Sequence, residues 1–180
     1  MADKKEMLAV VNEKDEVVGK GPRDMVHEKK LLHRAVIFFA FDMNGLIFVN
    51  RRTDTKDMFP GYWSIAAGGH VAAGENYRNA VLREGREELK AQRLPFFIAS
   101  HRLRVREEKE NRKVYGFIFN GVPEFDKSEI AEGRMMTLEE IKTVVKKEKF
   151  LPETSDMLKI LQREKTQKLI KMAIEEAKHG

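Results

Sequence analysis

Runs of hydrophobic and polar residues along the chain predict strands and helices in alternation. Two β-prone runs joined by a polar turn predict an N-terminal hairpin over residues 7–20, and the apolar run at 33–42 predicts a buried strand. Asn44–Gly45 marks a tight turn into a returning strand. A charged turn is expected at 107–112, between two of the later strands. These later β runs are expected at 64–69, 96–106 and 113–122.

Apolar residues at helical spacing predict four helices. The first begins at Pro22, a favourable first-turn residue, and the main one follows Asn76, a suitable N-cap. Thr137 and Glu140 form a capping box at the start of the third. The fourth is expected over about 153–178, with an apolar stripe that packs on the rest of the chain.

Interleaved strands and helices of this kind predict an α/β protein with a mixed sheet and helices on both faces. The length of 180 residues suits a single domain, 1–180. Its core is expected at about 33–145, with the hairpin and the last helix added at the two ends.

Composition narrows the functional classes. The chain has no cysteine, which excludes disulfides, zinc–thiolate sites and cysteine nucleophiles. Its 34 Lys and Arg outnumber 29 Asp and Glu, and the net charge of +5 suits a phosphate-bearing ligand. The chain has no basic block with interleaved aromatic residues, the pattern that would favour nucleic-acid binding. It also has no apolar stretch long enough for a signal peptide or a bilayer span. The sequence therefore predicts a cytoplasmic protein with no membrane or nucleic-acid partner.

Three glutamates, Glu84, Glu87 and Glu88, share one face of the predicted main helix, because positions i, i+3 and i+4 lie within an arc of about 100°. A solvated face is the ordinary explanation of such a cluster. Its position directly after Gly68–Gly69, with Glu75 between, favours a site for a hard divalent cation such as Mg²⁺ or Mn²⁺.

This stretch resembles the Nudix box, in which a glycine, a glutamate and an Arg-Glu…Glu-Glu segment stand at fixed spacing. The matching residues are Gly69, Glu75, Arg83, Glu84, Glu87 and Glu88. The chain departs from the motif at Gly85, Lys90 and Ala91. Gly85 lies on the packing side, so a closer contact between helix and sheet is expected. Lys90 replaces the glycine that ends the motif, so the helix is expected to continue into Gln92.

The resemblance covers residues 7–145 and implies a Nudix α/β/α sandwich that cleaves a diphosphate linkage, typically in a nucleoside diphosphate derivative, with Mg²⁺ or Mn²⁺. Carried over, Glu84, Glu87, Glu88 and the Gly69 carbonyl are metal ligands, and Glu84 is the first choice as general base. Arg83 and Glu75 form a supporting pair. A late loop offers Glu129, or Glu132 as second choice, as a further ligand.

The N-terminal half also resembles the isopentenyl-diphosphate isomerase branch of the family. That isomerase needs a cysteine where this chain has Gly68, so its activity is not expected here. It also binds metal through histidines and two glutamates on a later strand. His33 and His70 match in type, although structural roles are the commoner explanation for each, whereas Asn111 and Lys113 are expected in place of the glutamates.

Two arginines, Arg51 and Arg52, end a strand near the expected pocket, and one of them is the predicted diphosphate contact. The leading hypothesis is a Mg²⁺-dependent pyrophosphohydrolase acting on a small-molecule diphosphate. The alternative is a catalytically silent Nudix-fold module that binds a phosphorylated ligand. The hairpin and the last helix are candidate surfaces for a homodimer.

Overall fold

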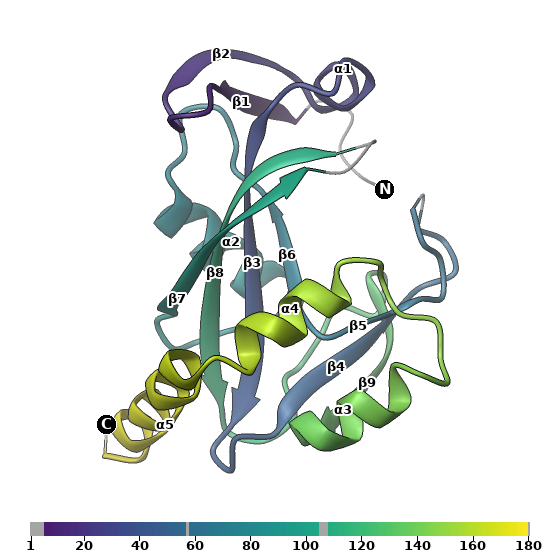
Figure 1. Cartoon of the computed structure of the whole chain (residues 1–180), viewed down its shortest axis with the longest axis vertical. Helices are drawn as coiled ribbons and strands as arrows, with labels where there is room; N and C mark the ends of the chain where they lie inside the picture. Colours follow the sequence, from purple (N-terminus) through teal and green to yellow (C-terminus); the bar gives the residue numbers. More distant parts are fainter. Residues whose placement is uncertain (1–5, 57, 105–107, 180) are drawn as a thin grey trace.

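The computed structural model describes residues 6–56, 58–104 and 108–179 (Figure 1). The predicted charged turn begins at Glu107, outside these residues. The elements run in the order β1 (Met7–Val11), β2 (Val17–Pro22), α1 (Arg23–Glu28), β3 (His33–Asp42), β4 (Ile47–Arg52), β5 (Trp63–Ser64), β6 (Ala67–His70), α2 (Tyr77–Leu89), β7 (Phe96–Arg104), β8 (Lys109–Phe119), β9 (Ile130–Met136), α3 (Leu138–Val144), α4 (Thr154–Leu161) and α5 (Glu164–His179).

Strand β3 organises the sheet that the described strands form. It pairs in parallel with β8 along its whole length, from His33 opposite Glu110 to Asp42 opposite Phe119. It pairs antiparallel with β6, so that Val36 lies opposite Gly69. The hairpin β1–β2 joins one end of β3, and β4, which carries β5 and β9, joins the other. The glycine-rich strand β6 is therefore a member of the sheet, paired with the middle of β3.

Apolar cores cover both faces of this sheet. Helix α2 contributes Ala80 and Val81 to one core, together with Phe38 and Phe117 of the sheet. Helices α3, α4 and α5 supply the other, for example through Ile160 of α4. In Figure 1, α4 and α5 lie in front of β3 and β8 while α2 lies behind them. The predicted mixed α/β sandwich with helices on both faces is confirmed.

Helix α2 carries the motif and begins as predicted, because the Asn76 side chain accepts a hydrogen bond from the Asn79 amide at 2.9 Å. Its predicted continuation to Gln92 is wrong. The helix ends at Leu89, and Lys90 takes the left-handed conformation, with φ 51° and ψ 35°. Lysine thus occupies the conformation that glycine adopts most easily at a helix C-terminus, and the chain still turns there.

The expected close contact at Gly85 is present. A Cβ atom at this position would overlap the ring of Phe117 on β8. The missing side chain therefore lets α2 lie nearer to the sheet than alanine would permit, at a helix-propensity cost of about 1 kcal/mol.

Three sequence predictions need correction. The last helix, expected over about 153–178, is two helices that break after Leu161, where the Gln167 side chain donates to the Leu161 carbonyl at 2.7 Å. Residues 109–112 of the expected charged turn are paired in β8. The expected loop after Glu129 becomes β9, whose Gly133 lies over the ring of Phe48. Among the described helices, none is long and apolar enough to cross a membrane.

Candidate active site

Arg83 is the centre of the network that fixes the acidic motif. Its guanidinium binds Glu75 through Nε at 3.2 Å and Nη2 at 3.0 Å, and Nη2 also donates to the His70 carbonyl at 3.0 Å. Its Nη1 donates to Glu84 at 2.7 Å and to Glu87 at 3.4 Å. The hydrogen bonds to Glu75 raise the pKa of Arg83 above its usual value, so it stays charged. The structure thus brings together the predicted pair of Arg83 and Glu75.

The glycines of β6 leave room for this acidic face. A Cβ atom at Gly69 would overlap the carboxylate of Glu84, so only glycine lets this buried acid lie against the β6 backbone. At the preceding residue, a Cβ on Gly68 would overlap the Val36 carbonyl of β3. The backbone at residue 68 therefore has no room for a side chain such as cysteine.

A cavity of about 130 Å³ opens beside Gly68. Its wall includes Glu88 from α2, Glu129 and two cations, Arg52 and Lys56. Lys56 forms an ion pair with Glu129. Of the two predicted phosphate contacts, Arg52 lines the cavity. Arg51 does not line it.

The acids proposed as ligands lie in different places. Glu84 is buried and Glu88 and Glu129 line the cavity, whereas the Glu87 side chain is 60% exposed and contacts Arg83. Glu132, the second choice for the late acid, lies on β9 and contacts Arg134 at 2.8 Å and Arg51 at 3.7 Å, outside the cavity wall. The geometry therefore favours Glu129 over Glu132 as the acid that completes the site.

Crowded carboxylates give the site its electrostatic character. Burial, followed by the nearby charge of Glu84, raises the pKa of Glu88 to about 8. Burial also raises the pKa of Glu84, although Arg83 partly opposes the shift. Both shifts arise because burial makes negative charge unfavourable by more than the nearby cations stabilise it.

These residues fit a hard divalent cation. The donors are carboxylate oxygens, which Mg²⁺ and Mn²⁺ prefer. Glu84 lies against Gly69 in space that a Cβ atom at that position would fill. Burial and the nearby charge of Glu84 both disfavour negative charge on Glu88. A cation here would relieve that penalty directly.

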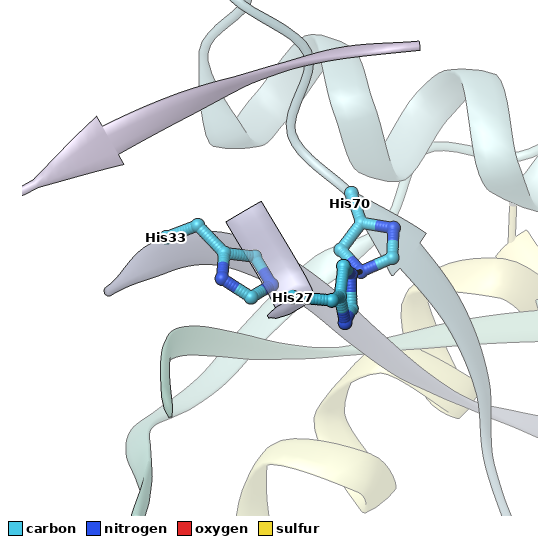
Figure 2. Close-up of side chains that lie close together, drawn as sticks. All are labelled: His27, His33 and His70. Atoms are coloured by element: carbon cyan, nitrogen blue, oxygen red, sulfur yellow. Dashed lines mark hydrogen bonds between the residues drawn. The ribbon is translucent and has the colours of Figure 1, made fainter. Parts of the chain in front are cut away.

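A second cluster lies near the end of β6. The rings of His27, His33 and His70 form a triangle with centroids 5.0 to 5.2 Å apart (Figure 2). Possible ligand atoms of His33, Glu108 and Glu110 also lie within 4.8 Å of one another. The expectation that Asn111 and Lys113 take the place of the strand glutamates is wrong. Parallel pairing of β3 with β8 sets Glu110 opposite His33.

Electrostatics within this second cluster are uneven. Burial lowers the pKa of His70 to about 3, so its imidazole is neutral. Burial alone would lower the pKa of His33, but Glu110 beside it raises the value overall. Burial alone would raise the pKa of Glu110, but His33 and Arg112 hold it below its usual range. The cluster thus combines a neutral imidazole with a charged carboxylate, donors that a metal ion can use.

Comparison with known proteins places the chain in a family. A family model for the NUDIX domain matches residues 31–158. The chain belongs to the Nudix hydrolase family. It is 36% identical over 140 residues to the uncharacterized Nudix hydrolase YfcD of Escherichia coli K12, covering 76% of each chain. It is 45% identical over 95 residues to the uncharacterized Nudix hydrolase SCO1686 of Streptomyces coelicolor, a match over 53% of this chain and about half, 52%, of that protein.

Solved Nudix-fold structures superpose on the chain. The crystal structure of DR0079 from Deinococcus radiodurans has a TM-score of 0.75 and 26% identity, and the match covers 88% of this chain and 100% of that one. The MutT protein of Methanosarcina mazei Go1 has a TM-score of 0.62 at 21% identity, covering 74% of this chain and 94% of that one, which shows the shared fold alone.

Two residues that line the cavity, Lys56 and Arg112, were missed by sequence reasoning. Lys56 lies in an irregular polar loop, where no periodicity marks it. Arg112 lines the cavity from β8 and was assigned to a turn. Its Nη1 atom is buried without a hydrogen-bond partner among the described residues. Residues 108–113 are all polar, so no alternation of apolar and polar residues marks Glu110 and Arg112 as part of a strand.

Proposed function

We propose that this Nudix chain is a pyrophosphohydrolase that cleaves a diphosphate linkage in a small molecule, of the nucleoside diphosphate derivative class, with Mg²⁺ or Mn²⁺. The observation that carries the proposal is the position of the box acids. Glu84 lies against Gly69, and Glu88 of the same helix lines the neighbouring cavity together with Glu129, Arg52 and Lys56. Acids for a metal and cations for phosphate thus meet in one cavity.

The proposed ligands are Glu84, Glu87, Glu88, Glu129 and the Gly69 carbonyl. A bound Mg²⁺ supplies positive charge at the diphosphate and makes an attacking water more acidic. Glu87 would have to turn inward from its exposed position beside Arg83 to take part. Glu129 would have to leave its ion pair with Lys56, which frees the lysine for substrate.

The remaining roles follow from contacts of the protein itself. Glu84 is the proposed general base, because burial raises its pKa toward the range in which a carboxylate accepts a proton efficiently. Arg83 and Glu75 position Glu84 and the backbone at His70. Arg52 and Lys56 are proposed to hold phosphate oxygens, for which a guanidinium offers paired donors.

A substrate panel tests the proposal. Nucleoside diphosphates linked to sugars, nucleosides and other groups are incubated with Mg²⁺, and release of a monophosphate is measured. We expect turnover of at least one compound class. Glu84→Gln and Glu88→Gln should each reduce kcat by about 10²–10³-fold, because each removes a preorganised charge. Glu139→Gln on the exposed face of α3 is the matched control and should leave kcat unchanged. Absence of turnover, with both Gln variants behaving as wild type, would contradict the proposal.

The silent-module alternative predicts a different outcome in the same panel. A binding module would gain thermal stability from a phosphorylated compound without releasing any product.

The cytoplasmic location and the homodimer stay predictions from the sequence. Val17 and Val18 of the hairpin are 59% and 63% exposed and offer one candidate contact surface, which size-exclusion chromatography with light scattering would test.

A further inference from the structure

Arg112 is a buried cation of the cavity wall that the proposed hydrolysis does not use. Its side chain is 7% exposed, and it lines the same cavity as Arg52 and Lys56. Its Nη1 atom is buried without a hydrogen-bond partner among the described residues. Buried polar groups are normally paired, because an unmade hydrogen bond in a dehydrated place is unfavourable. Arg112 Nη1 therefore lacks, within the described part of the chain, the acceptor that its burial calls for.

The guanidinium of Arg112 is held in a fixed orientation by Glu110. The Glu110 carboxylate accepts a hydrogen bond from Arg112 Nε, and both side chains of this ion pair are 7% exposed. Because the guanidinium is planar and rigid, fixing Nε also fixes the direction in which Nη1 donates. The pair has no net charge. Arg112 thus keeps a hydrogen-bond donor to offer although its positive charge is already compensated.

The acids of the cavity wall do not supply the missing acceptor. Glu88, Glu129 and Glu153 line the cavity, and Glu129 is paired with Lys56. Among the described residues, none of these three carboxylates forms an ion pair with Arg112. An acceptor for Nη1 would therefore come from a molecule that enters the cavity.

A second unpaired nitrogen lies opposite Arg112. Antiparallel pairing of β7 with β8 sets His101 opposite Arg112, and residues directly opposite in such a pair share a face of the sheet. His101 Nδ1 is also buried without a partner within the described ranges. Burial, followed by the charge of Arg112, lowers the pKa of His101, so its imidazole is neutral at pH 7. This face of the sheet therefore suits a polar group better than an apolar one.

The cavity restricts the size and the charge of that group. Its volume of about 130 Å³ is below the roughly 300–1,000 Å³ of pockets that enclose a whole drug-sized ligand, so a compact part of a substrate fits. An uncharged oxygen could accept from Nη1 without placing a second buried anion next to Glu110, which would be unfavourable. A hydrocarbon group would leave Nη1 buried and unpaired.

We propose that Arg112 selects diphosphates whose attached organic group carries an uncharged acceptor oxygen, which receives a hydrogen bond from Nη1. In nucleoside diphosphate derivatives this oxygen is either a carbonyl of the base or a hydroxyl of the sugar. Diphosphates of hydrocarbon groups are disfavoured. The inference rests on the proposed function, because it assigns the specificity of the same cavity.

Binding is measured in the full-length Glu84→Gln variant with Mg²⁺, by calorimetry, so that turnover does not interfere. The ligands are UDP, whose base has carbonyl oxygens, ADP, whose base has none, and isopentenyl diphosphate, whose organic group is a hydrocarbon. We expect UDP to bind at least about tenfold more tightly than isopentenyl diphosphate. Weak binding of ADP would assign the acceptor to the base, and equal binding of ADP and UDP would assign it to the sugar.

Arg112→Lys in this background is the decisive variant. Lysine keeps a positive charge for Glu110 but lacks the second arm of the guanidinium, so the preference for UDP over isopentenyl diphosphate should fall at least about tenfold. Arg112→Gln, checked for folding by circular dichroism, should lower the preference in the same way.

Arg134→Lys is the matched control. Arg134 donates through Nε at 2.8 Å to Glu132, two residues before it on β9, as Arg112 does to Glu110 on β8, but it lies outside the cavity wall. It should leave the preference unchanged. No binding of UDP, equal binding of UDP and isopentenyl diphosphate, or the same preference in Arg112→Lys and Arg134→Lys would overturn the inference.

Kinetics separate this inference from the proposed function. In an otherwise wild-type chain, Arg112→Lys should raise KM for the preferred substrate about tenfold or more with little change in kcat, because the contact lies away from the reacting phosphate. A preference in binding that depends on Arg112, without turnover by the wild type, would contradict the hydrolase and leave the specificity role standing. Turnover with a preference that Arg112→Lys does not alter would contradict the specificity role alone.

Discussion

Glu84, the proposed general base, illustrates how a missing side chain can make room for a buried acid. The acid lies on α2, yet its carboxylate occupies the space where residue 69 of β6 would place a Cβ atom. Arg83 holds the same carboxylate from the other side at 2.7 Å. The geometry of the proposed base therefore depends on a glycine in a neighbouring element as much as on the helix that carries it.

Gly69→Ala should therefore disable the site while preserving the fold. The new methyl group would displace the flexible end of Glu84, and a shift of about 1 Å in a reacting group reduces kcat by roughly 100-fold. Steady-state kinetics and circular dichroism measure the two effects. Gly19→Ala is the control, since its Cβ would meet nothing within 4 Å. Full activity in Gly69→Ala would show that Glu84 is not held where we describe it.

At this scale, sequence grouped the box residues and named His33 and His70 of the second cluster, but it missed His27, Glu108 and Glu110. Gly69, Glu75 and Arg83 stand at fixed spacing within one loop and one helix, so local pattern was sufficient to group them. His27 and Glu110 are brought to His33 by a short helix and a parallel strand pair. Parallel pairing joins segments far apart in sequence, and one chain carries no local signal for its register.

Helix α2 departs from its family motif at both Gly85 and Lys90, and each departure has a structural consequence. Lys90 adopts a left-handed conformation that costs a residue with a side chain about 1–2 kcal/mol. Lys90→Gly should raise the free energy of unfolding by about 0.5–1 kcal/mol, measured by urea denaturation. Lys90→Ala keeps the unfavourable conformation and should give no gain. Equal stabilisation by both variants would contradict this explanation.

Gly85→Ala should have the opposite effect. Alanine gains about 1 kcal/mol in helix propensity, but its methyl group would overlap the buried ring of Phe117. Overpacking of this kind costs about 1–3 kcal/mol, so we expect a net loss of about 1 kcal/mol. Urea denaturation measures it, with Arg86→Ala on the exposed face as the control. A stabilised Gly85→Ala would mean that α2 can move away from the sheet without penalty.

Elements with a strong local pattern were predicted well, and those defined by pairing were not. The hairpin, the buried strand and the capped helices follow from alternation, spacing and cap residues. Strand β9 contains Gly133 and several charges, which read as a loop, and it is a strand because β4 pairs with it. The start of β8 was predicted as a turn because it is rich in charged residues. In the structure, one of these charges, Glu110, pairs with the buried His33.

Across the whole molecule, the hairpin is tied to the sheet at a second point, the turn residue Asp15. Its carboxylate accepts hydrogen bonds from Arg34 of β3 at 3.1 Å, Tyr77 of α2 at 3.0 Å and Asn111 of β8 at 3.0 Å. Burial alone would raise the pKa of Asp15, but these donors together lower it. One side chain thus joins the hairpin to three elements of the core.

Asp15→Asn should destabilise the protein in a pH-dependent way. Because the folded-state pKa lies below the unfolded value of about 3.9, the carboxylate contributes stability above that pH and loses it as pH falls through the folded value. At pH 7 we expect a loss of about 1–3 kcal/mol in the free energy of unfolding, with the gap from wild type closing below about pH 4. Urea denaturation at pH 7, 5 and 3 measures it. Asp54→Asn, 83% exposed, is the control, and a gap that stays constant with pH would contradict the assignment.

The most direct test of the account is the location of Mn²⁺ in crystals, found from its anomalous scattering. We predict a peak within ligand distance of the Gly69 carbonyl and of the Glu84 and Glu88 carboxylates, at the cavity lined by Arg52 and Lys56. The peak should vanish in crystals of Glu84→Gln/Glu88→Gln. No Mn²⁺ at that position in wild-type crystals, or a peak that survives the double substitution, would contradict the claim that the acids of α2 hold a divalent cation beside the diphosphate pocket.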